Sequence, residues 1–145
     1  MRYVCALAVA FAAGSLLTAA GVPMAVHYIN HEKVTATMVK GGNIIEDNGL
    51  VVIANRAMQR GAEMHGKTNH VFIIVDGEAT FVTGGRLTNP TTPAANQVRG
   101  DGIEGGEAHH LSKGDVITIP ANTPHWWKDT SKTGSIGYYA VNIEQ

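Results

Sequence analysis

The sequence predicts an all-β domain built as a sandwich or barrel of short strands. Short apolar runs rich in β-branched and aromatic residues alternate with Gly, Asn and Asp, and strong helical periodicity is absent. The 17 glycines indicate many turns. With 145 residues, 44% of them hydrophobic and 16% charged, the chain suits one globular domain.

The strands are expected where apolar runs lie between turn signals. Asp76-Gly77 is a strong hairpin signal between two such runs. Gly49 and Gly114 belong to two further turns, each followed by a strand. The expected strands cover residues 49–54, 71–75, 78–82, 116–119 and 136–143, with a short strand from 103 through 111.

Three segments follow from this pattern. Residues 21–45 are expected to form an N-terminal arm and a first strand, and residues 46–145 the barrel. Residues 86–106, rich in Pro, Asn and Gly, are expected to form a long loop. Loops of this length are either lids or binding loops, or surface excursions, and the sequence favours neither.

Residues 1–20 have the layout of a secretory signal peptide. Arg2 supplies positive charge, Val4 to Leu17 is an apolar run, and Thr18-Ala19-Ala20 offers small residues for cleavage. We expect cleavage after Ala20, with residue 25 as the latest site and a retained N-terminal anchor as the alternative. The apolar run is shorter than the roughly 20 residues that span a bilayer. The protein is therefore expected to be secreted or periplasmic, without stable membrane insertion after cleavage.

Charge and cysteine content exclude several kinds of chemistry. The formal net charge is −1 and no long Lys/Arg run occurs, so nucleic acid is not an expected partner. The single cysteine, Cys5, lies in the predicted signal. A mature chain without cysteine has neither a disulfide nor a thiolate nucleophile or metal ligand.

Histidines on β-like segments are the main candidates for a functional site. Side chains two residues apart share a strand face, so Glu63 and His65 point the same way, and so do His70 and Phe72. His125, which follows a segment between two prolines, supplies a third imidazole. Three imidazoles and one carboxylate can bind a divalent transition metal, here Fe, Mn, Ni, Cu or Zn. We expect His65, His70, His125 and Glu63 to be the ligands.

These two segments resemble the two signature motifs of the cupin superfamily. The first motif is His-x-His, three or four residues, Glu, six residues and Gly. The second is Gly, five residues, Pro-x-Gly, two residues, His, three residues and Asn. The matching positions are Glu63, His65, His70, Gly77, Gly114, Pro120, Asn122, His125 and Asp129. The resemblance implies a single-domain cupin, of the type-2-like kind, with a double-stranded β-helix or jelly-roll barrel.

The donors depart from the family pattern in their order. Glu63 stands where the first family His would be, and His70 where the family Glu would be. Asn122 replaces the usual Gly, and Asn also tolerates a left-handed backbone. Glu63 is therefore interpreted as a ligand, as an acceptor for a ligand N–H, or as a general base, with an exposed surface carboxylate as the other interpretation.

Further residues complete the expected site. One residue of each aromatic pair, Trp126-Trp127 and Tyr138-Tyr139, should face inward. We assign Trp127 to the pocket and Tyr139 as a catalytic acid or base, with a place in the barrel wall as the alternative for the tyrosine. Phe72 and Ile74 share the face of His70 and are expected to line a substrate pocket beneath it. This lining suits a small, partly apolar organic molecule.

Three functions remain open at the level of sequence. The first is a metal-dependent enzyme on a small organic molecule, of the dioxygenase, isomerase or lyase type that the resemblance implies. The second is a non-catalytic cupin that binds a metal or a small ligand. The third is a metal-free structural barrel. A homodimer, which is common in the family, is compatible with all three.

Overall fold

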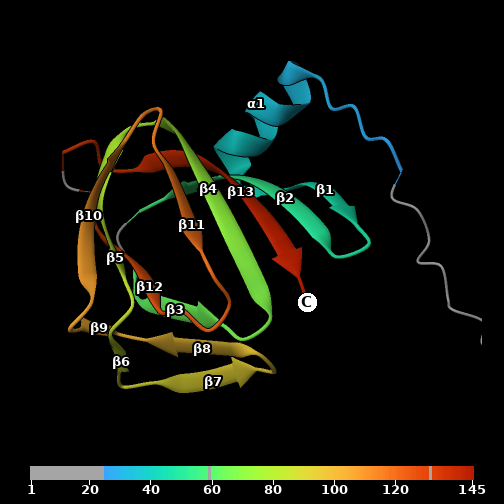
Figure 1. Cartoon of the computed structure of the whole chain (residues 1–145). Coiled ribbons are helices and arrows are strands. Elements are labelled where there is room, and N and C mark those ends of the chain that lie inside the picture. The colour runs from blue at the N-terminus through green and yellow to red at the C-terminus, as the bar shows by residue number, and fades with distance from the viewer. Residues whose placement is uncertain (1–24, 59, 131) are drawn as a thin grey trace, which may run out of the picture.

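Two antiparallel β-sheets face each other and enclose the interior of the molecule. The computed structural model describes residues 25–58, 60–130 and 132–145 (Figure 1). One sheet has the strand order β1-β2-β13-β4-β11 and the other β10-β5-β12-β3-β8-β7, with a small pair β6-β9 beside them. The predicted all-β barrel is thus the observed architecture.

The elements follow one another closely along the chain. The first sheet contains β1 (Gly42–Asp47), β2 (Leu50–Ala57), β4 (Thr68–Asp76), β11 (Val116–Ile119) and β13 (Ile136–Glu144). The second contains β3 (Ala62–His65), β5 (Glu78–Thr83), β7 (Thr91–Ala94), β8 (Gln97–Gly100), β10 (Glu107–Ser112) and β12 (His125–Asp129). The remaining elements are α1 (His31–Lys40), β6 (Arg86–Thr88) and β9 (Gly102–Glu104).

Strand β4 shows the alternation that the sequence predicts. Thr68, His70, Phe72 and Ile74 are buried, whereas the residues between them are half-buried or exposed. The same face therefore presents polar side chains at one end of the strand and apolar ones at the other. The apolar end joins the core, whose buried residues are Ala57, Phe72, Ile74, Ala79, Phe81, Leu111, Ile119, Trp127, Ile136, Tyr138 and Ala140.

Helix α1 is the element that the sequence analysis missed, because residues 21–45 were expected to hold only an arm and a strand. Its ends carry clear capping signals: the Asn30 side chain accepts a hydrogen bond from the Lys33 N–H, and Gly41 follows with a φ of 73°. Glu32 in the first turn and Lys40 in the last suit the helix dipole. None of its residues is buried, and only Val34, Thr37 and Met38 are half-buried, so the face that periodicity could detect is short.

Residues 86–106 do not form the expected long loop. They form β6, β7, β8 and β9, in which β6 pairs with β9 and β7 pairs with β8. Strands of three or four residues are too short to show a period of two, and Asn96, with a φ of 60°, supplies the tight turn between β7 and β8. Because β8 also pairs with β3, this segment extends the sheet that carries His65.

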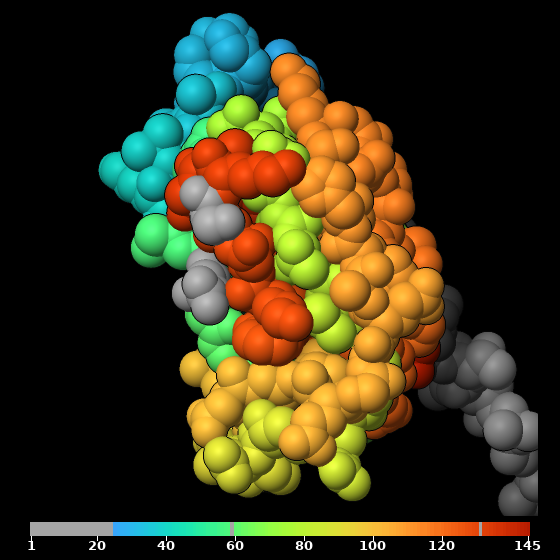
Figure 2. Space-filling view, turned by 90° about the vertical axis from the view of Figure 1, so that its left-hand side faces the viewer, coloured from blue at the N-terminus to red at the C-terminus, as the bar shows by residue number. Residues whose placement is uncertain are grey.

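The two ends of the barrel differ in what covers them. Helix α1 lies at one end, and the β7–β8 hairpin at the opposite end, in both views (Figures 1 and 2). The main-chain N–H of Gly66 donates to the carbonyl of Asn96 at 2.7 Å, which holds the hairpin turn against the connection between β3 and β4.

No helix among the described residues is long and apolar enough to cross a membrane.

Candidate metal centre

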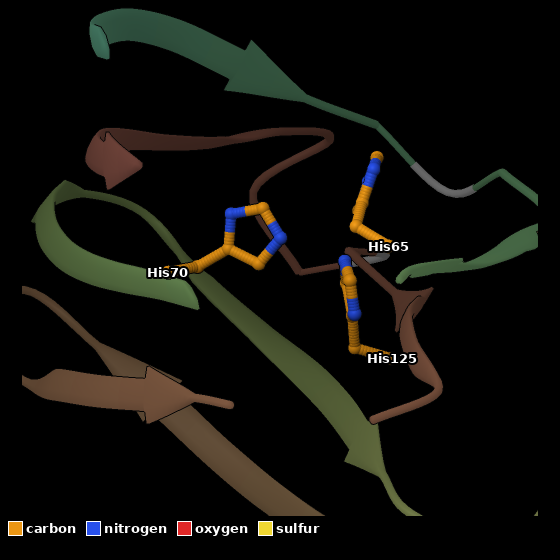
Figure 3. Close-up of side chains that lie close together, drawn as sticks. All are labelled: His65, His70 and His125. Carbon is orange, nitrogen blue, oxygen red and sulfur yellow. The ribbon is translucent and has the colours of Figure 1, made fainter. Parts of the chain in front are cut away.

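Three histidines from both sheets meet inside the barrel. His70 lies on β4 in the first sheet, His65 ends β3 and His125 begins β12 in the second. Their rings point toward one another (Figure 3), with centroids 5.0 to 5.6 Å apart. Each histidine offers one ring nitrogen to the site, and these three nitrogens lie within 4.8 Å of one another. The structure therefore brings together the three imidazoles that the sequence analysis selected.

Main-chain hydrogen bonds hold the segments that carry these histidines. The Asn122 N–H donates to the carbonyl of His65 at 2.8 Å. The Ala121 N–H donates to the side-chain oxygen of Asn69, the neighbour of His70, at 2.9 Å. Asn122 has a φ of 63°, the left-handed conformation expected for an Asn at the position of the family Gly. The turn before β12 is thereby fixed to the turn between β3 and β4.

The outer nitrogens of two rings are tied to fixed acceptors. His70 Nδ1–H donates to the side-chain oxygen of Asn142 at 2.8 Å, and His125 Nδ1–H donates to the carbonyl of Thr123 at 3.0 Å. Each bond places the proton on Nδ1 and leaves the Nε2 lone pair free. This arrangement, in which the distal nitrogen is anchored and the other faces inward, is the usual one for metal-binding histidine.

The inward-facing nitrogens of His70 and His125 form no hydrogen bond within the part of the chain that the structure describes. Both of these Nε2 atoms are buried. A buried polar atom without a partner costs about 1 to 3 kcal/mol. Two such atoms directed at one point, beside a third imidazole, fit a divalent cation that would accept both lone pairs.

Glu63 lies beside two of the three histidines. Its carboxylate oxygens are 3.7 Å from His125 Nε2 and 3.9 Å from His65 Nε2. These separations are too long for hydrogen bonds but resemble those of ligands that share one ion, roughly 3 to 4 Å for bonds of about 2.1 Å. The group of ligand atoms within 4.8 Å contains the three histidines alone, so Glu63 stands at the edge of the site.

The surroundings favour the protonation states that metal binding needs. Burial, opposed in part by the hydrogen bond to Asn142, lowers the pKa of His70 to about 4, and burial also lowers the pKa of His65. Burial alone would raise the pKa of Glu63, but the neighbouring His125, together with His65 and Arg60, outweighs burial and lowers the pKa to about 2. At neutral pH the site thus offers neutral His65 and His70 and an ionised carboxylate.

The histidines open into a cavity of about 260 Å³. A water molecule occupies about 30 Å³ of liquid volume, so this space suits a metal ion with a small ligand. The lining residues are Ile53, Asn55, Arg60, Glu63, His65, Thr68, His70, Phe72, His125, Tyr138, Ala140, Asn142 and Glu144.

The predicted pocket residues separate into two groups. Phe72 lines the cavity as expected. Ile74 and Trp127 do not, and this placement corrects their assignment to the pocket. The Phe72 ring stacks on the Trp127 ring at 5.7 Å and 11° and contacts the Tyr138 ring at 5.0 Å. These rings close the inner end of the cavity, and Trp127 and Ile74 pack in the core beneath them.

The tyrosine expected to act in the site is on the wrong face of β13. Tyr139 is half-buried on the outer face and does not line the cavity, so its assignment as a catalytic residue is corrected. Tyr138 is buried and faces inward, where burial raises the pKa of its phenol. Strand alternation predicted that one of the two would be inside, but the choice depends on the register of β13.

Other cavity residues went unrecognised in the sequence. Asn142 anchors His70, while Asn55 and Arg60 lie near the Tyr138 hydroxyl. On β13, Tyr138, Ala140 and Asn142 alternate on the inward face. A polar Asn in the inward register of the last strand was the signal that could have identified Asn142.

The comparisons with known proteins agree with this architecture. A family model described as cupin matches residues 26–145. Among solved structures, FeII HppE is similar with a TM-score of 0.54 and 15% identity over 71% of this chain and 50% of that one. The structure of hydroxypropylphosphonic acid epoxidase from S. wedmorenis is similar with a TM-score of 0.53 and 16% identity. The match covers 71% of this chain and 49% of that one.

A shorter structure is similar over most of its own length as well. The double-stranded β-helix protein from Klebsiella pneumoniae gives a TM-score of 0.51 and 16% identity, covering 70% of this chain and 69% of that one. By contrast, this chain spans only about half the length of each of the two structures above, 50% of the first and 49% of the second. At these identities the likeness concerns the fold alone, and no curated protein matches the sequence. Two facing antiparallel sheets and a family match over residues 26–145 show that the chain belongs to the cupin family.

Proposed function

We propose that this protein is a metal-dependent cupin enzyme that acts on a small organic molecule. The observation that carries the proposal is the pair of buried Nε2 atoms of His70 and His125, which form no hydrogen bond among the described residues and whose Nδ1 atoms are anchored. With His65 they provide three imidazole ligands, and Glu63 is the proposed fourth. Three or four protein ligands leave coordination positions toward the cavity for water or substrate.

A divalent metal at this position would act as a Lewis acid, an activator of O₂ or a source of hydroxide. The chain itself supplies the remaining functions. Phe72 and the core rings beneath it close the inner end of the cavity and keep bulk water from that side. If Glu63 does not bind the metal, its carboxylate can accept a proton beside the histidines, and the Tyr138 phenol can hold a proton at the inner end of the cavity.

The dioxygenase, isomerase and lyase reactions remain the candidate types. Fe(II) is the first metal to test, because one structural neighbour is described as FeII HppE. Elemental analysis of the protein purified without a histidine tag or chelator is the first experiment. We expect about one equivalent of metal in the wild type, and a sharp loss in His70→Ala with the β fold retained. Unchanged occupancy in His70→Ala would remove the proposed centre.

The runner-up is a non-catalytic cupin that binds a metal or a small ligand. It gains support if Glu63 and the three histidines saturate the ion and leave no open position. Azide added to the Co(II)-loaded protein distinguishes the two. A change in the visible Co(II) spectrum indicates an exchangeable position and supports the enzyme, whereas an unchanged spectrum supports the binder. His70→Glu, which restores the family's usual donor type, should keep metal binding.

We also propose that the protein is exported and forms a homodimer. The export proposal rests on the pattern in residues 1–20, which lie outside the described residues, so mass spectrometry of the mature N-terminus is its test.

The dimer proposal is supported by an apolar row on the outer face of the first sheet, where Val116, Ile73 and Tyr139 are neighbours across three strands. Ile73 and Val116 are exposed. Light scattering of wild type and Ile73→Glu tests it.

A further inference from the structure

A cluster of hydrogen-bond donors lies at the Tyr138 end of the metal-site cavity. Asn55 on β2 and Tyr138 on β13 are direct neighbours across the two strands, and Arg60 follows β2. All three line the same cavity as the histidines. The Asn55 amide nitrogen is 3.4 Å and an Arg60 guanidinium nitrogen 3.5 Å from the Tyr138 hydroxyl oxygen.

The donors in this cluster outnumber the acceptors. The Asn55 side-chain oxygen accepts from the Arg56 N–H at 2.8 Å, which turns the amide NH₂ toward the phenol. The phenol oxygen is approached by two donors, at distances longer than the usual 2.7 to 3.2 Å. Among the described residues, no carboxylate lies within 4.0 Å of the Arg60 guanidinium. An amide, a guanidinium and a phenol therefore have hydrogen-bonding capacity left for a ligand.

Two carboxylates, Glu63 and Glu144, also line the cavity. Glu144 lies on β13 six residues after Tyr138, which is about 20 Å along a strand, and it accepts a hydrogen bond from Thr68. Glu63 lies beside His65 and His125, and its carboxylate also interacts with the charge of Arg60. A negatively charged ligand group would be repelled near Glu144 and attracted to Arg60. Among the described residues that line the cavity, Arg60 alone carries a guanidinium or ammonium group, so an anionic group is expected to bind there.

We propose that the substrate of this metal centre is a small organic acid whose anionic group binds to Arg60, Asn55 and Tyr138. Guanidinium groups bind carboxylates and phosphate-type groups through paired, charge-assisted hydrogen bonds. The amide and the phenol add donors to the same oxygens, and the rest of the molecule reaches the metal past Phe72. The volume of about 260 Å³ suits a small substrate. This inference rests on the proposed function and adds to it the class of substrate.

The test measures binding of short anions rather than turnover. Calorimetric titrations of the metal-loaded protein use malonate, succinate and glutarate as carboxylate probes, 3-phosphonopropanoate as the phosphonate probe and succinamide as the neutral analogue. The variants are Arg60→Met and Arg60→Lys. Arg86→Met is the matched control, because Arg86 is exposed on β6 and pairs with Glu104 away from the cavity. Metal affinity is measured separately for each variant.

We expect at least one anion to bind the wild type and the Arg86→Met control equally. Arg60→Met should weaken that binding about 10- to 100-fold, with a smaller loss in Arg60→Lys and unchanged metal affinity. Succinamide should not respond to Arg60→Met. Preference for the phosphonate or for a carboxylate probe identifies which acid group the cluster receives.

Two results would overturn the inference. One is that none of the anions binds the metal-loaded protein at millimolar concentration. The other is that the anions bind equally to wild type and Arg60→Met. The same titrations on the metal-free protein separate the two proposals. Arg60-dependent anion binding in a protein that takes up no metal contradicts the metal centre alone, whereas metal binding without Arg60-dependent anion binding contradicts this inference alone.

Discussion

The hydrogen bond between His70 and Asn142 is expected to control metal affinity. In Asn142→Leu, His70 loses the acceptor that holds its proton on Nδ1 at 2.8 Å. Without metal, the ring can move that proton to Nε2, which faces the cavity, and so avoid a buried donor without a partner. Metal binding forces the proton back to Nδ1, so the cost of the orphaned N–H falls on the metal-bound state.

The magnitude follows from that cost. A buried donor without a partner costs about 1 to 3 kcal/mol, and a tenfold change in affinity corresponds to about 1.4 kcal/mol. We therefore expect Asn142→Leu to weaken metal binding about 10- to 100-fold, in the range seen when the outer partner of a ligand histidine is removed. His70→Ala, which removes the ligand itself, should weaken it more.

Competition with a chelating indicator of known affinity measures this effect. Asn43→Leu is the control, because Asn43 is exposed on β1 and its side chain donates to Glu46 outside the cavity. Asn142→Asp keeps an acceptor for His70 and should bind metal at least as tightly as the wild type. Wild-type metal affinity in a folded Asn142→Leu protein would refute the assignment of His70 as an oriented ligand.

Three further predictions concern stability. Metal should stabilise the fold because it satisfies the buried Nε2 atoms of His70 and His125, and at 100 times its Kd it should add about 2.7 kcal/mol, visible as a rise in Tm that a chelator reverses. The pKa of His70, lowered to about 4, means that the metal-free native state binds fewer protons than the unfolded state between pH 4 and about 6.5. The contribution of His70 to the free energy of unfolding is therefore fully present above about pH 6.5 and is lost as the pH drops toward 4, by up to roughly 3 kcal/mol. Urea titrations should show that the free energy of unfolding depends less on pH in His70→Leu than in the wild type. Gly77 and Gly84 both have positive φ, but a Cβ at Gly77 would lie 2.5 Å from the Ser135 carbonyl oxygen, whereas a Cβ at Gly84 meets open space. Gly77→Ala should cost more unfolding free energy than the roughly 1 kcal/mol expected for Gly84→Ala, and equal losses would contradict this contact.

The part of the fold that local patterns encode was predictable. Alternation along β4 placed His70, Phe72 and Ile74 on one face, and the Asp76-Gly77 turn was correctly placed between β4 and β5. The hairpin expected at this turn was wrong, because β4 and β5 pair with other strands in different sheets. Helix α1 and the strands of residues 86–104 were missed for physical reasons. The helix buries no residue and has only a short half-buried face, and the short strands gain their pairing from each other and from β3.

The sequence by itself determined the all-β class and the three histidines, because residue type and strand periodicity are local properties. The tertiary structure decided which polar side chains meet them. Asn142 anchors His70, and Tyr138 rather than Tyr139 faces inward, because the register of β13 against β2 and β4 sets both positions. It also separated Ile74 and Trp127 from the cavity, because depth within the barrel depends on how the two sheets pack. Pairing across strands far apart in the chain leaves no local signal, so these choices appear only in the folded molecule.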